Sequence, residues 1–458
     1  MVPRSCTQHP ARRTVAAPPA SNYHRRVRTR SIGPFTVTAV GSGNVCLPIS
    51  GGRGLRASDV EHALHETIAF GVTLIDVAAH ADSEKLVGQV VRDQRARDRV
   101  VVATHVPLLG TLLDARPGPP RDLLRERLPM PYLQHRVDTA LLATRLDALP
   151  LVQLPLRPAW LTSPAWPELV GTCARLVQEG KVLTWAAWLD DLDDLGDLGD
   201  LGDLESIANH ADRVEAVERT TPGGLIVLAD LTALEPYEEA ARLAGPPART
   251  TAADRDGRHA RLDHADAASR APLDHPGSAS AGTATVAGLL AEPWLAAVAV
   301  TYQLCDRRAE PLFAAAAARK LPVLAHHPLA GGALAGALAP GVRLPPRDDR
   351  NALGAAELER IAVGVARLTG LVKRAPPAAT ASAAAREAAE RAARTRPEHV
   401  HCGDVAELAL RVAIDRAGIA LPRLHRRDHL LPAIAAAAAP PLPADLLAEI
   451  DQIFPPSR

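Results

Sequence analysis

The sequence predicts an α/β fold and, within that class, a (β/α)8 TIM barrel with long insertions. Short apolar runs alternate with helical patterns, which is typical of βα units around a parallel sheet. About eight such runs occur, and eight parallel strands are the number that closes a barrel. The predicted strands are 35–40, 72–77, 100–106, 149–154, 182–188, 297–302, 322–326 and 419–423.

Helix signals lie between these strands. Ser58, followed three residues later by Glu61, forms the pattern of a capping box, and Gly71 is placed to end that helix. Ser83 is a candidate N-cap for a second helix. Further helices are predicted at 84–94, 166–178 and 310–319.

One barrel domain at 31–454 accounts for most of the chain, and the remaining stretches have compositions that a packed core does not favour. The start is arginine-rich without an apolar core, and we expect it to be disordered. The exceptions to a minimal barrel are the basic tail at 1–30, low-complexity or disordered inserts at 190–204 and 249–283, and an Ala/Arg-rich helical insert at 340–396 with helices near 355–368 and 381–394.

The overall charge offers no attraction to nucleic acid or to an anionic membrane. Lys+Arg and Asp+Glu both number 52, so the formal net charge is zero. No apolar run approaches the roughly 20 residues that a membrane helix needs. The five cysteines are widely spaced without a CxxC pair, which indicates neither disulfides nor a zinc knuckle and suits the cytoplasm. Nothing in the sequence indicates an oligomeric state.

Several blocks of sequence together resemble the aldo/keto reductase family, and they occur in that family's order. The blocks are GVTLIDVAAHADSEKLVG at 71–88, GKVLTW at 180–185, TYQLCDRRAEPLF at 301–313, HPLAGGALAG at 327–336 and LPRLHRRDHL at 421–430. The resemblance implies a barrel whose C-terminal mouth holds Asp, Tyr, Lys and His. In the family the tyrosine protonates a small carbonyl substrate as hydride arrives from NADPH.

The matching positions of this chain differ from the family's catalytic set. Asp76 matches the aspartate, whereas the tyrosine position falls on Ala81 or His80. His105 stands at the lysine position and Pro155 at the histidine position. Our candidate catalytic residues are therefore Asp76, His80 and His105. Because the acid, the cation and the orienting imidazole are replaced, we expect weak or absent reductase activity.

The nucleotide positions that the resemblance implies are partly kept. The family's nicotinamide amide site matches Trp188 and Leu189, which are apolar replacements. An aromatic ring and an amide remain at the stacking position, and positive charge remains in the phosphate loop. The candidate cofactor-binding residues are Tyr302, Gln303, Arg423, Arg426 and Arg427.

Two alternatives to a reductase remain open at this point. One is a non-catalytic barrel that binds a nucleotide, a metabolite or a partner protein. The other is a hydrolase or lyase that uses Asp76, His80 and His105, with His326 and His327 facing them across the mouth. Such a set is capable of acid/base exchange or of holding a divalent metal. We favour histidines without a metal, and we therefore name no metal ligand.

Overall fold

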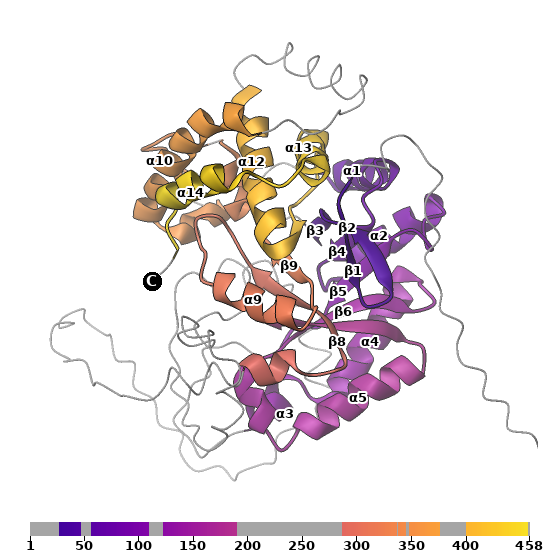
Figure 1. The fold of residues 1–458 in the computed structure, drawn as a ribbon. Coiled ribbons are helices and arrows are strands. Elements are labelled where there is room, and N and C mark those ends of the chain that lie inside the picture. Colours follow the sequence, from indigo (N-terminus) through magenta and orange to yellow (C-terminus); the bar gives the residue numbers. More distant parts are fainter. Residues whose placement is uncertain are drawn as a thin grey trace, which may run out of the picture.

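A parallel sheet of eight strands forms the centre of the molecule, as the sequence predicts (Figure 1). The structure is a computed structural model that describes residues 27–46, 56–109, 122–189, 286–336, 338–344, 348–375 and 400–456. Neighbouring strands follow chain order from β3 to β10, and each described pairing is parallel. The barrel strands are β3 (Ser42–Val45), β4 (Leu74–Val77), β5 (Val101–His105), β6 (Leu149–Pro155), β7 (Val182–Leu189), β8 (Leu295–Thr301), β9 (Val323–His326) and β10 (Gly418–Leu421).

The barrel is closed by backbone contacts between β10 and the segment around β3. Val40 bridges Ala420 in parallel, and the Gly43 amide donates to the Pro422 carbonyl at 2.8 Å. A Cβ at Gly43 would lie 2.1 Å from the Leu421 carbonyl oxygen. Glycine is therefore required here, because no side chain fits between the first and last strands.

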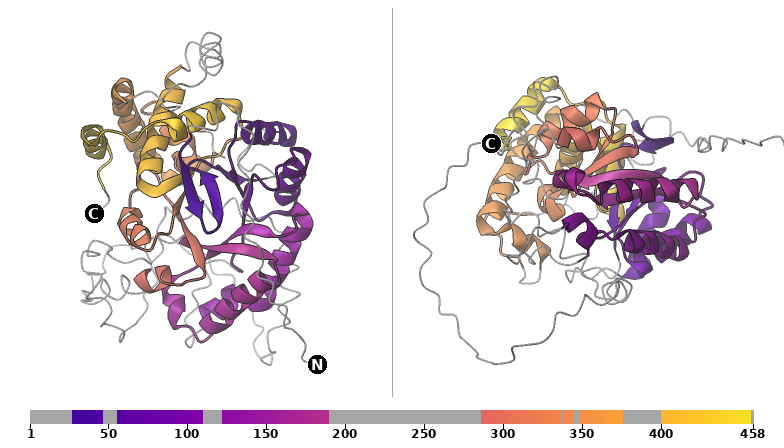
Figure 2. Two further views of the ribbon diagram at one scale, coloured as in Figure 1. Left: turned by 45° about the vertical axis from the view of Figure 1, so that its right-hand side comes forward. Right: turned by 90° about the horizontal axis from the view of Figure 1, so that it is seen from below.

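An antiparallel hairpin of β1 (Thr29–Ile32) and β2 (Phe35–Thr38) precedes the barrel. Ile32, Phe35 and Val37 pack into the barrel interior together with residues that begin the parallel strands. The hairpin lies across the barrel in Figure 2. The prediction that 35–40 is the first barrel strand is therefore wrong, since β3 takes that place. The hairpin also starts at Thr29, inside the segment predicted as a tail.

Helices surround the sheet and begin close to the predicted positions (Figure 1). The Ser58 capping box is wrong, because the first helix has Arg56 as N-cap, whose amide donates to Asp59. Ser83 lies inside its helix and is not the cap, since His80 occupies that position. The α-helices are α1 (Ala57–Ala69), α2 (Ala81–Asp93), α3 (Leu123–Arg127), α4 (Met130–Thr144), α5 (Trp166–Gln178), α9 (Glu310–Ala318), α10 (Ala355–Leu371), α12 (Val400–Ala417), α13 (Arg427–Ala438) and α14 (Ala444–Ile453).

Short 3-10 helices complete the described elements: η1 (Pro158–Thr162), η5 (Ala330–Ala335), η6 (Asp349–Leu353) and η7 (Val372–Arg374). The helix predicted near 355–368 is confirmed as α10. The basic tail up to residue 26, both low-complexity inserts and the helix predicted at 381–394 lie outside the described residues. Within the described ranges, no helix has the length and apolar character to cross a bilayer.

The Ser-Glu-x-x-x-Gly block of the sequence packs α2 against β5 and α4. Buried Glu84 accepts a hydrogen bond from the Thr104 hydroxyl at 2.7 Å and pairs with Arg136 of α4. Gly88 lies against the end of α4, where a Cβ would come within 2.0 Å of the Thr144 carbonyl oxygen. This block therefore positions a helix behind the sheet and leaves the mouth of the barrel to other residues.

We expect Gly88→Ala to lower the free energy of unfolding by about 1–3 kcal/mol, because the added methyl meets fixed backbone of α4. Gly171→Ala in α5 is the matched control, since a Cβ there meets nothing within 4 Å. The control should be neutral or stabilising by up to about 1 kcal/mol. Urea unfolding followed by circular dichroism measures both, and equal stabilities of the two variants would contradict this account of Gly88.

Candidate active site

The C-terminal end of the barrel holds a ring of polar side chains on the interior face of the strands. Alternate residues of a strand point to the same side, and the inward residues below this ring are apolar. Leu74, Leu151 and Leu324 occupy that lower position, two residues before Asp76, Gln153 and His326. Active sites of this fold lie at this end of the strands. The ring is formed by Asp76 of β4, His105 of β5, Gln153 of β6, Trp188 of β7 and His326 of β9.

Asp76 is the centre of this ring and is completely buried. Its Oδ1 accepts from His105 Nε2 and from Gln153 Nε2, each at 2.6 Å. Its Oδ2 accepts from the Asn44 amide at 2.8 Å. Burial alone would raise the pKa of Asp76, but the two neighbouring histidines and these donors outweigh it and hold the pKa below its usual range. The carboxylate is therefore ionised, and both of its oxygens accept hydrogen bonds.

Gln153 and His326 extend the network to the other side of the barrel. His326 Nε2 lies 2.9 Å from Gln153 Oε1 and donates to it, while its Nδ1 is 3.7 Å from Asp76 Oδ2. Burial lowers the pKa of His326 to about 3, against the opposing effect of Asp76. His326 is therefore neutral at physiological pH. It donates to Gln153, which in turn donates to Asp76.

Trp188 covers the two histidines. Its ring stacks on His326 with centroids 4.8 Å apart and meets His105 edge-on at 4.3 Å. Trp188 is 8% exposed and His105 is 4% exposed. In the described part of the molecule, Trp188 Nε1 and His105 Nδ1 are both buried without a hydrogen-bond partner. An indole N–H is a donor, and Nδ1 of a neutral imidazole with its proton on Nε2 is an acceptor.

Two of the three candidate catalytic residues come together and one does not. Asp76 and His105 are hydrogen-bonded, whereas His80 is the N-cap of α2. Its imidazole makes no hydrogen bond with Asp76 or His105 within the residues that the structure describes. Gln153 was not identified as a candidate from the sequence, and His326 was named only in the hydrolase or lyase alternative. Their place could have been predicted by counting alternate positions along each strand.

The two described tyrosines donate to acceptors other than Asp76. The Tyr132 hydroxyl donates to the Pro107 carbonyl at 2.8 Å, and burial raises its pKa to about 12. The Tyr302 hydroxyl donates to Glu310 at 2.7 Å, and burial raises its pKa above the usual range. Tyr23 and Tyr237 lie outside the described residues. Neither of the two described tyrosines donates to Asp76.

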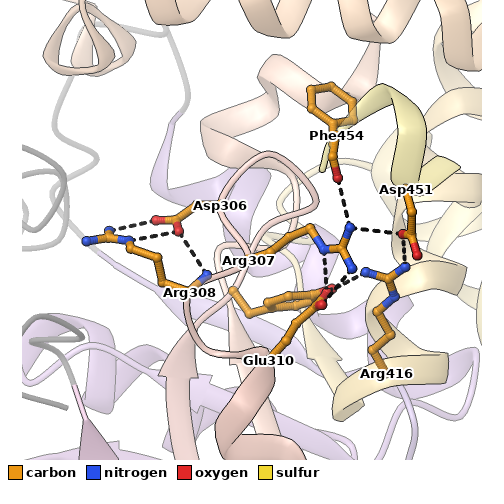
Figure 3. Close-up of polar contacts among 8 residues, drawn as sticks. Asp306, Arg307, Arg308, Glu310, Arg416, Asp451 and Phe454 are labelled. Atoms are coloured by element: carbon orange, nitrogen blue, oxygen red, sulfur yellow. Dashed lines mark hydrogen bonds and ion pairs between the residues drawn. The ribbon is translucent and has the colours of Figure 1, made fainter. Parts of the chain in front are cut away.

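Tyr302, the predicted stacking platform, lies in the protein interior. It is fully buried, with its ring edge-on to Phe313, so no ring face is open to a ligand. Its partner Glu310 belongs to an ionic cluster with Arg307, Arg416 and Asp451, which Figure 3 shows converging between the β8–α9 turn, α12 and α14. Gln303 lies in the same turn and accepts from the Cys305 thiol at 3.4 Å.

The three candidate arginines after β10 have different surroundings. Arg427 pairs with Glu66 of α1 at 2.8 Å and lies over the Phe70 ring. Arg426 is exposed and is the N-cap of α13, and Arg423 is half-buried. A helix N-terminus with arginines suits an anion such as a phosphate.

Among the described residues, no group of three or more His, Cys, Asp or Glu side chains is arranged to hold a metal ion.

Acid should destabilise the protein in the range where His326 resists protonation. Its folded pKa of about 3 lies below the ordinary 6.5, so the unfolded chain takes up the proton first. The contribution of His326 to the free energy of unfolding is fully present above about pH 6.5 and is lost as the pH falls toward 3. The contribution of Asp76 is lost below about pH 3.8. Asp76, His105 and His327 face His326.

We expect urea unfolding between pH 7 and pH 4 to show a fall of a few kcal/mol. His326→Gln should flatten this fall, because glutamine does not titrate. His135→Gln, on the outer helix α4, is the control and should leave the slope unchanged. A His326→Gln curve parallel to that of the wild type would contradict the assignment.

Comparisons with known proteins agree with this fold. Residues 279–454 match the model of the aldo/keto reductase family. No curated protein sequence matches the chain.

Solved structures match over 94% of the chain. They include an aldo-keto reductase from Klebsiella pneumoniae in complex with NADPH (19% identity, 96% of that chain, TM-score 0.46). Another is an aldo-keto reductase from Bacillus halodurans in its holo form (14% identity, 97% of that chain, TM-score 0.50). A third is the glycerol dehydrogenase from Gluconobacter oxydans (15% identity, 97% of that chain, TM-score 0.50). The chain therefore has the barrel fold of the Bacillus and Gluconobacter proteins, and its residues 279–454 are similar in sequence to the aldo/keto reductase family.

Proposed function

We propose that the chain is an aldo/keto reductase-like barrel that binds a nucleotide of the NADPH type by its phosphates and reduces carbonyl compounds weakly or not at all. The family match at 279–454 supports the first part, since it includes the loop after β10. The observation that carries the second part is the hydrogen bonding of Asp76. Its acceptors are taken by Asn44, His105 and Gln153, and no described phenol contacts it.

Reduction of a carbonyl requires a proton donor that is made more acidic by its surroundings. The described tyrosines have raised pKa values and donate to Pro107 and Glu310. His105 directs its Nε2 proton to Asp76, so that proton is held by a carboxylate. Removal of a positioned acid typically costs about 10²- to 10⁴-fold in rate. Ordinary aldehyde reduction should therefore be slow.

The two ends of the implied nucleotide site differ in fit. Arg426 and the N-terminus of α13 suit the phosphates, with Arg423 beside them in sequence. The nicotinamide end does not fit, because Tyr302 is buried and Trp188 occupies the interior between His105 and His326. NADPH would supply hydride if its nicotinamide were correctly placed. The described residues around Trp188 and Tyr302 offer no groups to place it.

Purified full-length protein should reduce 4-nitrobenzaldehyde with NADPH no faster than its Asp76→Asn variant does. Asparagine keeps the shape of the aspartate but removes the charge on which a reductase of this family would depend. Loss of NADPH absorbance measures the rate, and near-UV circular dichroism checks that the variant is folded. Turnover by the wild type that Asp76→Asn abolishes would show a working reductase and contradict the proposal.

NADPH fluorescence titration should detect binding without turnover. Arg426→Ala should weaken NADPH about tenfold, as expected for the loss of one charge-assisted hydrogen bond, and should affect NADH less. Arg97→Ala, a surface arginine paired with Asp147, is the control and should leave both affinities unchanged. Equal affinity of the wild type and Arg426→Ala for NADPH would remove the phosphate assignment.

A further inference from the structure

We propose that the mouth of the barrel catalyses proton transfer on a small α-hydroxy carbonyl compound, with His105 Nδ1 as the base and the Trp188 indole N–H as the donor to the carbonyl oxygen. The inference rests on the proposed function only for the place of the ligand. It needs neither nucleotide nor hydride.

The first argument is the orientation of His105. Because Asp76 Oδ1 accepts from His105 Nε2 at 2.6 Å, the neutral imidazole carries its proton on Nε2. Its lone pair is then on Nδ1, which is buried without a partner among the described residues. Gln153 donates to the same Oδ1 at 2.6 Å and so holds the carboxylate in place. A carboxylate that fixes an imidazole in one tautomer leaves the other nitrogen as a base.

The second argument is the indole of Trp188. Its Nε1 is also buried without a partner in the described residues, and an unsatisfied buried donor destabilises the folded state. The ring centroids of Trp188 and His105 are 4.3 Å apart, so the two atoms without a partner belong to side chains in direct contact. A ligand that pairs with both atoms offers an acidic hydrogen to His105 Nδ1 and an oxygen acceptor to Trp188 Nε1. A hydroxyl-bearing carbon next to a carbonyl has both.

The third argument is that the rest of the ring cannot serve as the base. Asp76 has its acceptors occupied, and its pKa is held low. His326 directs Nε2 to Gln153, and its ring face is covered by Trp188. Trp188 is the most exposed member of the ring, at 8%, so an entering ligand meets the indole first.

The reaction balances without an oxidant or a reductant. His105 Nδ1 takes the proton from the hydroxyl-bearing carbon, and that C–H electron pair forms a carbon–carbon double bond. The carbonyl electron pair moves to its oxygen, which accepts a hydrogen bond from Trp188 Nε1. Return of the proton to the other carbon, with transfer of the hydroxyl proton between the two oxygens, exchanges the aldehyde and alcohol positions.

The test uses glycolaldehyde, the smallest α-hydroxy aldehyde, labelled with carbon-13 at the aldehyde carbon. Full-length protein without nucleotide should move the label to the hydroxymethyl carbon, which carbon-13 NMR detects. His105→Gln keeps a donor to Asp76 but removes the base, and should slow the exchange about 10²- to 10⁴-fold. Trp188→Phe keeps the ring but removes the N–H, and should slow it about 10²-fold.

His135→Gln on α4 is the matched control and should exchange the label at the wild-type rate. If the wild type leaves the label in place, or if both His105→Gln and Trp188→Phe retain the wild-type rate, the inference is wrong. Failure of the proposed function is read separately, from NADPH titration and aldehyde reduction. Nitrogen-15 NMR of labelled histidine should also show the His105 proton on Nε2, and Asp76→Asn should redistribute it between the nitrogens if Asp76 is the positioning residue.

Discussion

The mouth of this barrel depends on one buried charge. An ionised carboxylate without solvent is costly unless donors surround it, and Asp76 receives donors from β5, β6 and the backbone of β3. Gln153 passes the contact on to His326 of β9. A single aspartate on β4 thereby constrains the ends of five of the eight strands. A change in any of these donors would leave the carboxylate incompletely compensated.

The same compensation determines what chemistry the mouth can support. A carboxylate whose two oxygens both accept hydrogen bonds does not take up another proton readily, and the His105 proton that it holds is not available to a substrate. The unsatisfied polar atoms of the ring are an imidazole nitrogen and an indole N–H. A base and a neutral hydrogen-bond donor suit the removal of a proton from a substrate carbon. They suit carbonyl reduction less, because that reaction requires an acid that releases its proton.

A second ionic cluster joins α14 to α12 and to the turn between β8 and α9. Arg307 and Arg416 bridge Glu310 and Asp451, and Arg307 also donates to the Phe454 carbonyl at 2.8 Å (Figure 3). The positive and negative charges of these four residues balance. The Tyr302 hydroxyl donates to Glu310 of this cluster, and its buried ring packs edge-on against Phe313.

The sequence alone determined the alternation of strands and helices, because hydrophobic periodicity is a local property. It also placed Asp76 near His105, since both lie at the ends of adjacent parallel strands. The hairpin was not predictable, because Phe35–Thr38 has the same apolar pattern as a barrel strand, and only packing against the strand ends distinguishes them. The partners of Asp76 were likewise decided by the tertiary structure. Gln153 and His326 are distant in sequence, and closure of the barrel brings them to one buried charge that must be compensated.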